Sequence, residues 1–284
     1  MDGFVLIDKD IGLTSREVSS RVGRFFKTKK AGHVGTLDPF ASGLLLVMIN
    51  KANKSAICFD DLSKKYVATI KLGEYRDSLD ITGQKIKEKE IPYLNIDQIN
   101  EALSSFLGVS QQSIPLTSAK HVNGVRLYEY AHKGLEIDLP THEIEVHDIK
   151  LIDYHDDEIT FEAHVSKGTY IRVLGADIAE KLGTVGYLKQ LRRTEVPPFN
   201  VLEAIKLDDL KEDSLIPTGE ILSRFIKTRI VSDNEANDIK NGKVTIYEKE
   251  VADTDKLLIV NENKNPIALY TNVNNQYIFR RGLF

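Results

Sequence analysis

Gly32-His33-Val34-Gly35-Thr36-Leu37-Asp38-Pro39-Phe40-Ala41-Ser42-Gly43 is the stretch around which this 284-residue chain is organised. It lies between a basic run, residues 27–30, and an apolar run, residues 44–49. Three glycines and a proline predict a loop, because glycine accepts positive φ and proline fixes φ and lacks a backbone donor. Asp38 then has two interpretations, which this stretch alone leaves open. It opens a turn, as Asp-Pro pairs commonly do, or a rigid loop presents its carboxylate to a substrate that carries phosphates.

The composition, 42% hydrophobic and 28% charged, is typical of a soluble globular protein, and the length allows one large domain plus a small one. The single cysteine, Cys58, excludes an intramolecular disulfide and a cysteine-rich metal site, and its apolar neighbours predict a buried, inert thiol. The N-terminus has no basic segment, and the longest strictly apolar run is six residues. We therefore expect no signal peptide, no membrane span and a cytoplasmic location.

Charge is distributed unevenly along the chain, although the net charge is only −4. Residues 16–54 carry eight Lys and Arg against Glu17 and Asp38, whereas residues 203–220 carry six acidic residues against Lys206 and Lys211. This asymmetry favours a protein that meets a polyanion on one face. A surface that is unevenly charged but merely solvated is the alternative.

The first quarter of the chain has a clear pattern of elements. Thr14-Ser15-Arg16-Glu17 has the spacing of a capping box, and apolar residues at 18, 22 and 25 or 26 fall on one helical face. The continuous apolar run at 44–49 indicates a central strand that is buried on both faces. We expect strands at 4–7, 44–49 and 65–72, a helix at 15–27 and a short helix at 51–59.

The middle of the chain contains one segment without a clear pattern, an insertion at 109–142 that includes Gln111-Gln112. Its length exceeds that of most connections and is typical of a binding element. We expect a polar loop at 73–83 with Asp77 and Asp80, helices at 95–107, near 126–132 and at 170–182, and strands at about 143–153, 158–166 and 185–193.

The last third begins with an acidic stretch, 201–224, which we expect to be helical and to mark a domain boundary. Ser232-Asp233-Asn234-Glu235 again has capping-box spacing. Short strands expected at 244–247, 256–261, 266–271 and 276–280 have the spacing of a small β-barrel. Helices and strands are interleaved irregularly and without repeats, which predicts an α+β domain with a mixed sheet rather than a doubly wound fold.

Several familiar sites are missing from the sequence. It contains neither a phosphate-cradle loop that ends in Gly-Lys-Ser/Thr, nor a three-glycine dinucleotide fingerprint, nor a His-Glu-x-x-His pair. The seven histidines are scattered, so we expect no metal site. A single carboxylate among cations remains, together with Tyr66 and Arg172 in strongly patterned segments.

Residues 32–43 resemble the signature of the bacterial tRNA pseudouridine-55 synthases, the TruB-type pseudouridine synthases. Further motifs follow in the order of that family: Lys64-Lys65-Tyr66; Gly73 with Asp77-Ser78-Leu79-Asp80-Ile81-Thr82-Gly83; Pro115-Leu116-Thr117-Ser118-Ala119-Lys120 with Gly124-Val125-Arg126-Leu127-Tyr128; Gly168-Thr169-Tyr170-Ile171-Arg172; and Leu188-Lys189-Gln190-Leu191-Arg192-Arg193-Thr194. The resemblance covers residues 3–199, and the tail more loosely resembles the family's small C-terminal RNA-binding domain.

This resemblance implies the pseudouridine synthase fold, an α+β fold in which helices flank a mixed, mainly antiparallel central sheet. It implies a catalytic domain at 1–225, with the RNA-binding insertion at about 109–142. It further implies a small, β-rich, PUA-like RNA-binding domain at 226–284.

The implied activity is that of an isomerase, which converts uridine 55 in the T loop of tRNA to pseudouridine. The bond from C1′ to N1 is broken and remade to C5, which requires no cofactor and no metal. Asp38 matches the catalytic aspartate, Arg172 the arginine that pairs with it, and Tyr66 the tyrosine that stacks on the base. Sequence leaves open whether Asp38 attacks the base, attacks C1′ or acts through a glycal.

The target uridine must be flipped out of the folded RNA, which costs a few kcal/mol of unstacking. In the family pattern His33 fills the vacated space, Asp80 contacts the displaced region, and Tyr170 and Leu191 line the uracil pocket. The cations expected to contact tRNA are Lys9, Lys120, Arg126, Arg192 and Arg193.

Two motifs depart from the family pattern. Lys9-Asp10 replaces Lys-Pro, and Ile114-Pro115-Leu116-Thr117-Ser118-Ala119 replaces Pro-Pro-x-Tyr-Ser-Ala, so that the insertion loses a tyrosine. We expect a stand-alone, monomeric enzyme that acts on the tRNA T arm. The alternatives are a catalytically inactive tRNA-binding protein or tRNA-folding chaperone of the same fold, and a guide-RNA-dependent relative.

Overall fold

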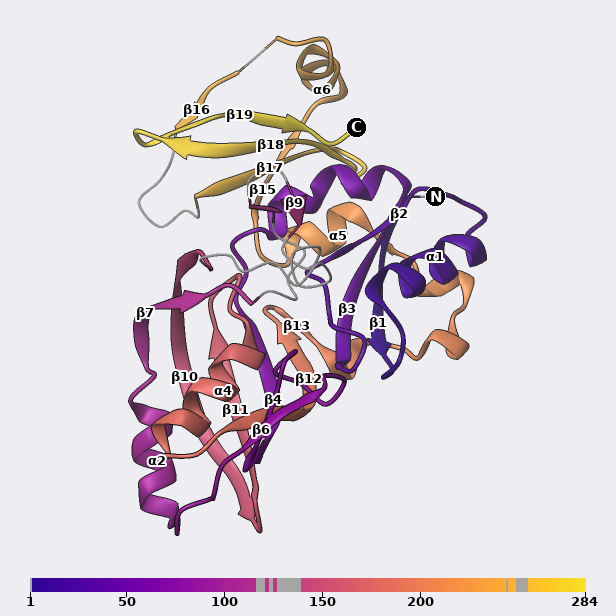
Figure 1. Ribbon diagram of the computed structural model, residues 1–284. Coiled ribbons are helices and arrows are strands. Elements are labelled where there is room, and N and C mark those ends of the chain that lie inside the picture. Colours follow the sequence, from indigo (N-terminus) through magenta and orange to yellow (C-terminus); the bar gives the residue numbers. More distant parts are fainter. Residues whose placement is uncertain (1, 116–120, 123–124, 127–138, 244, 249–254) are drawn as a thin grey trace. The chain divides into compact units, whose positions relative to one another are not determined.

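The computed structural model describes residues 2–115, 121–122, 125–126, 139–243, 245–248 and 255–284 (Figure 1). The chain forms two compact units, and neither is continuous in sequence. The first contains residues up to 38, residues 44–60 and residues 198–284, and the second contains residues 39–43 and 61–197.

The first unit begins with two buried strands and a capped helix. Its N-terminal elements are β1 (Gly3–Lys9), α1 (Ser15–Phe25), β2 (Ala31–Val34), β3 (Ser42–Ile49, of which 44–49 belong to this unit) and the 3-10 helix η1 (Asn50–Phe59). Strand β3 lies beside β1 and pairs antiparallel with β2. The expected capping box is confirmed, since the Glu17 N–H donates to Thr14 Oγ1 and the Glu17 carboxylate accepts from the Thr14 N–H.

The apolar face of α1 packs on these strands. Val18 and Val22 form one buried cluster with Val5, Ile7, Leu45, Val47 and Ile49. Strand β3 is buried on both faces, as predicted. The loop predicted over 32–43 is shorter than expected, because Ala31–Val34 form β2 and β3 already begins at Ser42.

The acidic stretch 201–224 is not one helix. It contains the 3-10 helices η2 (Val201–Glu203), η3 (Leu207–Asp209) and η4 (Glu212–Ser214), then β14 (Ile216–Pro217), which pairs with β1, and α5 (Thr218–Ser223). The side chain of Leu202 is 89% exposed. A long helix here would have no continuous apolar face to bury, and packing of such a face supplies most of a helix's stability in a protein.

The C-terminal part of the first unit is a five-stranded mixed sheet in the order β15-β17-β18-β19-β16. The strands are β15 (Lys227–Val231), β16 (Tyr247–Glu248), β17 (Lys256–Asn261), β18 (Pro266–Val273) and β19 (Gln276–Gly282), and the helix is α6 (Asp233–Lys240). Helix α6 contributes Ala236 and Ile239 to the buried cluster of this sheet. Three of the four expected strands are confirmed, β15 was missed, and residue 244 lies outside the described residues.

The second unit contains an antiparallel sheet in the order β12-β4-β11-β10-β7. Its strands are β4 (Lys64–Leu72), β7 (Gly108–Ser113), β10 (Thr141–His155), β11 (Glu158–Val165) and β12 (Gly186–Val196). Helix α2 (Ile96–Ser104) packs against β10, and α4 (Ile171–Lys181) packs against β12 and β4 (Figure 1). Ser42 and Gly43 add a parallel pairing with Arg192 and Arg193, so the arrangement is mixed but mainly antiparallel, as expected.

Two predictions for the second unit need correction. The loop at 73–83 includes β5 (Glu74–Arg76), which forms a hairpin with β6 (Lys85–Glu88). The insertion is shorter than predicted at both ends, because β7 occupies 108–113 and β10 begins at 141. Within the insertion, β8 (His121–Val122) pairs with β9 (Val125–Arg126), and the helix expected near 126–132 falls largely outside the described residues.

Gly43 lies where two backbones approach too closely for a side chain. Its φ is +106°, and a Cβ atom here would lie 2.2 Å from the carbonyl oxygen of Arg193. We expect Gly43→Ala to lower the free energy of unfolding by about 2–4 kcal/mol, because strain and overpacking add. Urea denaturation measures this change.

Gly12→Ala is the matched control for Gly43→Ala. The φ of Gly12 is +90°, but its Cβ would meet no atom of the described residues within 4 Å. Only backbone strain remains there, which costs about 1 kcal/mol. Equal losses in the two variants would show that close contact with Arg193 adds nothing.

Candidate active site

Helix α1 fixes the residue that precedes Asp38. Ser15, in its first turn, makes two hydrogen bonds with Leu37: the Leu37 N–H donates to Ser15 Oγ (2.8 Å), and Ser15 Oγ donates to the Leu37 carbonyl (3.0 Å). Leu37 is buried, whereas Asp38 is partly exposed. Asp38 can therefore both open a turn and present its carboxylate to a substrate. The hydrogen bonds that hold the Leu37 backbone limit the directions that this carboxylate can take.

His33 is held by the same helix. It lies on β2, half-buried, with Nδ1 3.0 Å from Ser19 Oγ and Nε2 3.3 Å from Thr36 Oγ1. Ser19 Oγ donates to the Ser15 carbonyl one turn earlier on α1. His33 and Leu37 are thus anchored to successive turns of one helix.

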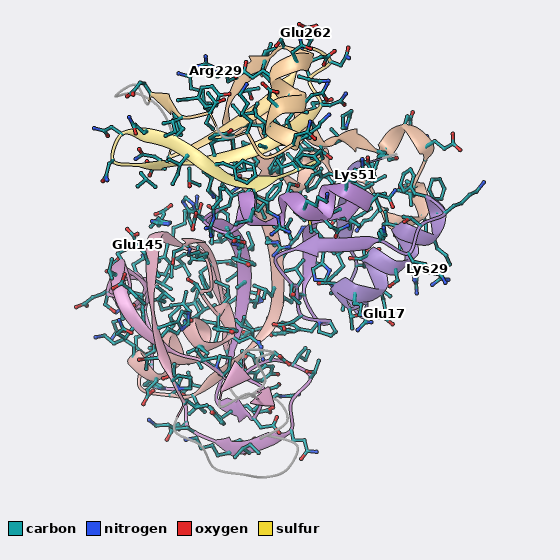
Figure 2. The ribbon with its side chains drawn as sticks, turned by 90° about the horizontal axis from the view of Figure 1, so that it is seen from above. Glu17, Lys29, Lys51, Glu145, Arg229 and Glu262 are labelled. Carbon is teal, nitrogen blue, oxygen red and sulfur yellow. The ribbon has the colours of Figure 1, made fainter. Side chains whose placement is uncertain are left out.

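Lys9 lies at the end of β1 and is 1% exposed. Its ammonium donates to the carbonyls of Asp10 (3.1 Å) and Leu13 (2.7 Å), and so holds the turn between β1 and α1. The expected contact of Lys9 with RNA stays a prediction. The eight Lys and Arg side chains of residues 16–54 are all exposed, among them Lys29 and Lys51, which are labelled in Figure 2.

The second unit presents Tyr66, Leu191 and Arg193 on one face of neighbouring strands. Tyr66 on β4 is the register partner of Arg193 on β12, and Ala68 is the partner of Leu191. Because side chains alternate along a strand, these four share a face, and Arg192 points to the other. Tyr66, Leu191 and Arg193 are buried, while Arg192 Nη1 lies 3.4 Å from Ser42 Oγ. Contacts of the two arginines with RNA stay predictions.

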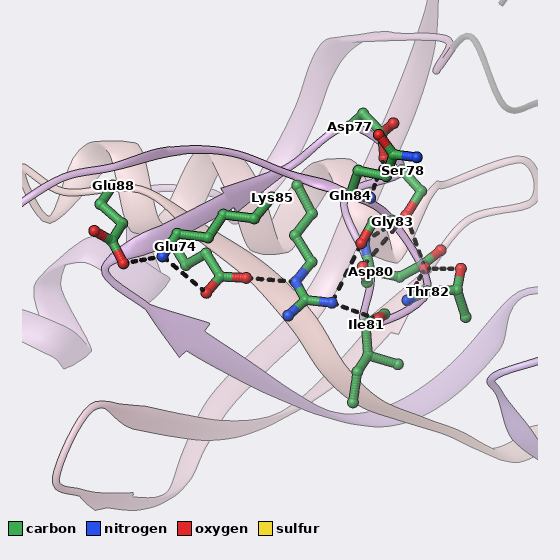
Figure 3. A network of polar contacts seen from close by, with 11 residues as sticks. Glu74, Asp77, Ser78, Asp80, Ile81, Thr82, Gly83, Gln84, Lys85 and Glu88 are labelled. Carbon is green, nitrogen blue, oxygen red and sulfur yellow. Dashed lines mark hydrogen bonds and ion pairs between the residues drawn. The ribbon is translucent and has the colours of Figure 1, made fainter.

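Arg172 lies in the first turn of α4 and is 5% exposed. Its Nη1 donates to the Ser78 carbonyl (2.8 Å) and lies 3.5 Å from Asp80 Oδ2. Asp80 is equally buried, and its Oδ1 accepts hydrogen bonds from Ser78 Oγ (2.9 Å), Thr82 N–H (2.9 Å) and Thr82 Oγ1 (2.5 Å), as Figure 3 shows. A buried ion pair that is hydrogen-bonded in this way has a fixed geometry.

Arg76, on β5, braces the loop that contains Asp80, and sequence reasoning did not single it out. Its Nε donates to Glu74 Oε1 (2.6 Å), and its Nη1 donates to the carbonyls of Ile81 (2.6 Å) and Gly83 (3.3 Å). These three partners are labelled in Figure 3. Its guanidinium also stacks over the Tyr187 ring, 4.4 Å from the ring centre. Its position beside an Asp-rich loop was the only sequence signal that could have identified it.

Tyr170 occupies the N-cap position of α4, two residues before Arg172. Its N–H donates to Gln112 Oε1 (2.8 Å), and its carbonyl accepts from Gln112 Nε2 (3.1 Å). The His142 ring meets the Tyr170 ring edge-on, with centres 5.9 Å apart. Gln112 was noted in the insertion but had no assigned role, because spacing along the chain does not reveal a partner 58 residues away.

The remaining predicted RNA contacts lie in the insertion. Lys120 lies outside the described residues. Arg126 lies in β9, where its backbone pairs with His121. Both contacts stay predictions.

Asp177, on the same helix as Arg172, has an unfavourable environment for a charge. Burial and the nearby Glu180 carboxylate raise the pKa of Asp177 to about 6. Because the pKa of Asp177 is higher in the folded than in the unfolded state, its ionised carboxylate lowers the free energy of unfolding at pH values above the folded pKa. This loss of stability disappears below the unfolded pKa of about 3.9, where the carboxyl is protonated in both states. We expect Asp177→Asn to raise the free energy of unfolding at pH 8 by about 1 kcal/mol, allowing for partial exposure.

Urea denaturation at several pH values tests this expectation for Asp177→Asn. The gain in free energy of unfolding should shrink as the pH falls through 6. Glu101→Gln, at an exposed position on α2, is the control and should show no comparable gain at pH 8. An Asp177→Asn variant no more stable than the parent at pH 8 would contradict the raised pKa.

The cysteine thiol and possible metal ligands are the other candidates for chemistry. Burial raises the pKa of the Cys58 thiol to about 12, which agrees with the expected inert cysteine. In the part of the chain that the structure describes, no group of three or more His, Cys, Asp or Glu side chains could hold a metal ion. Within the same residues no helix is both long and apolar enough to cross a membrane.

Solved structures show the same fold. The chain in a crystal structure of a Cbf5-Nop10-Gar1 complex superimposes with a TM-score of 0.76 at 22% identity, covering 99% of this chain and 85% of that one. The chain in an archaeal box H/ACA sRNP Nop10-Cbf5 complex gives a TM-score of 0.71 at 21% identity, covering 99% and 86%. The expected pseudouridine synthase fold is confirmed.

Sequence comparison identifies closer relatives. Proteins named tRNA pseudouridine synthase B share 41% identity in Caldicellulosiruptor saccharolyticus, over 85% of this chain and 83% of that protein, and 35% in Acholeplasma laidlawii, over 98% of both. Residues 23–171 match the N-terminal domain of the TruB family pseudouridylate synthases, and residues 172–228 match the tRNA pseudouridylate synthase B C-terminal domain. Because the matches include the segments of Asp38, Asp80 and Arg172, this chain belongs to the TruB family of pseudouridylate synthases.

Proposed function

We propose that this chain isomerises a uridine of tRNA to pseudouridine. The bond between C1′ and N1 breaks, a bond between C1′ and C5 forms, C5 loses its proton and N1 ends protonated, so the reaction is balanced without a co-reactant. The observation that supports this most strongly is family membership, because relatives named tRNA pseudouridine synthase B align over most of both chains. The presence of Asp38, Tyr66 and Arg172 together adds support, since a protein that only binds RNA needs none of the three.

Asp38 is the covalent catalyst in this proposal, and its attachment beside the clamped Leu37 limits its motion. Arg172 supplies the buried positive charge of the site. Tyr66 stacks on the base and assists removal of the C5 proton. We assign Asp80 to holding Arg172 rather than to contacting displaced RNA, because Asp80 is 4% exposed and its carboxylate is already hydrogen-bonded.

The substrate that we propose is the T arm of tRNA, with position 55 flipped out of the loop. His33 fills the gap that the base leaves, and Tyr170 and Leu191 line the uracil pocket. The exposed cations of residues 16–54 suit the phosphate backbone. We further propose that the enzyme acts as a monomer in the cytoplasm, and that residues 1–225 form its catalytic domain and residues 226–284 a PUA-like RNA-binding domain.

Tritium release tests this function, because formation of the C1′–C5 bond expels the hydrogen of C5. A T-arm stem-loop labelled at C5 of uridine should release tritium with purified protein alone. The same stem-loop with its target uridine replaced by cytidine, and an anticodon stem-loop, should release none. Release from the anticodon stem-loop would contradict T-arm specificity.

Two further outcomes would favour the alternatives. Binding without release, from both the stem-loop and full-length tRNA, would identify an inactive tRNA-binding protein or chaperone. Release that depends on an added guide RNA would identify a guide-dependent enzyme.

A further inference from the structure

Gln112 is a buried amide on the strand at the end of the antiparallel sheet. It lies on β7 and is 3% exposed, whereas its neighbour Gln111 is exposed. A glutamine amide has one accepting and one donating end, and burial without partners for both would be costly. The two partners of Gln112 are the N–H and the carbonyl of a single residue, Tyr170.

This pair of hydrogen bonds imitates the pairing that a neighbouring strand would give. It holds Tyr170 extended, with φ −90° and ψ 105°, immediately before α4 begins. The Tyr170 carbonyl also accepts from Leu174 N–H (3.1 Å), which starts the helix. The Tyr170 side chain makes no cap hydrogen bond, so Gln112 takes over part of the capping role from a distant strand.

His142 secures the other end of the same segment. It is the register partner of Gln112 across β7 and β10, and its Nε2 donates to the Gly168 carbonyl (3.1 Å). The φ of Gly168 is +81°, a conformation that glycine adopts readily. Two residues that face each other on neighbouring strands therefore hold the turn 168–170 at both ends.

We propose that Gln112 is a positioning residue for pseudouridine formation, assisted by His142. Its amide fixes the backbone from which Tyr170 lines the uracil pocket and from which α4 carries Arg172. This inference rests on the proposed function. Displacement of catalytic groups by about 1 Å can cost 100-fold in rate, so the expected defect lies in the chemical step and not in tRNA affinity.

Gln112→Glu gives a readout that a purely structural residue would not move. An ionised carboxylate only accepts hydrogen bonds and would face the Tyr170 carbonyl with like charge, whereas a protonated carboxyl donates and accepts as the amide does. Burial raises the pKa of the introduced carboxyl above its usual 4.3. Relative to the parent enzyme, we expect a single-turnover rate about 30-fold lower at pH 8 that recovers to within about fivefold at pH 5.5.

Gln112→Met, which fills the same space without either hydrogen bond, should be slow at both pH values. Gln111→Met is the matched control and should retain the parent rate. The experiment measures single-turnover tritium release at saturating enzyme, and filter binding of tRNA, on preparations shown to be folded by circular dichroism. tRNA dissociation constants within threefold of the parent value are expected throughout.

A Gln112→Glu rate within twofold of the parent at pH 8, or a relative rate independent of pH, would overturn the inference. So would a loss confined to tRNA affinity. If Gln112→Met does not fold, the comparison of Gln112→Glu at two pH values decides alone. An inactive parent enzyme would instead overturn the proposed function, and an active parent with an indifferent Gln112→Glu variant would overturn only the role of Gln112.

Discussion

Asp38→Asn is expected to reduce uridine isomerisation by about 10⁴-fold or more and to leave tRNA affinity nearly unchanged, because the amide keeps the size of the side chain but is not a competent nucleophile. The backbone clamp between Ser15 and Leu37 involves no atom of the Asp38 side chain, so the loop should keep its shape. Single-turnover tritium release measures the rate, and filter binding measures the affinity.

Asp10→Asn provides the control for this result. Asp10 is an exposed aspartate of the same unit, whose carboxylate pairs with Lys206 (2.6 Å), and its substitution should leave turnover unchanged. Normal turnover by Asp38→Asn would show that another group is the catalyst. Loss of tRNA binding together with turnover would assign Asp38 to RNA recognition.

Substitution of Arg172 is expected to have the second-largest effect. Arg172→Lys keeps the charge but loses the planar guanidinium, which reaches the Ser78 carbonyl and Asp80 together, and we expect a loss of about 100-fold in the single-turnover rate. Arg172→Met leaves Asp80 buried without this cation, which should also cost about 3–5 kcal/mol in the free energy of unfolding.

The stability part of this prediction has an internal check. Adding Asp80→Asn to Arg172→Met removes the unpaired charge and should restore part of the lost free energy of unfolding, whereas independent sites would give additive losses. Lys181→Met, at an exposed position in the last turn of the same helix, should change neither stability nor rate by a comparable amount. Additive losses would show that the Arg172–Asp80 pair is energetically uncoupled.

Sequence patterns predicted the elements whose stability is local. The helix at α1 follows from its cap and apolar face, and β3 from six consecutive apolar residues. Strand β2 was missed, because Ala31-Gly32-His33-Val34 has little β propensity and becomes a strand by pairing with β3. The stretch 201–224 forms short helices rather than one long helix, because its apolar residues do not make one continuous face, and Ile221 and Leu222 are buried within the short helix α5.

The residues of the candidate site likewise divide into those that local motifs identify and those whose surroundings depend on the fold. Motifs identified Asp38, Tyr66 and Arg172, but the burial of Lys9 and Arg193 was not evident, because long cationic side chains are usually exposed. Arg76 acts on carbonyls only five and seven residues along the chain, and its position beside the Asp-rich loop was its one sequence signal. Gln112 acts on the backbone of a residue 58 positions away, which only the folded sheet brings to it. Such partners leave no periodic or compositional trace in the sequence.

The attachment of Leu37 to Ser15 has a consequence for how the protein responds to heat. Ser15 belongs to the first turn of α1, and helix ends fray at a lower free energy than that of global unfolding. We expect opening of this first turn, which the Thr14–Glu17 cap opposes, to release the residue next to Asp38 while the rest of the molecule stays native. The order of the loop that carries Asp38 would then be lost at a lower temperature than the whole fold.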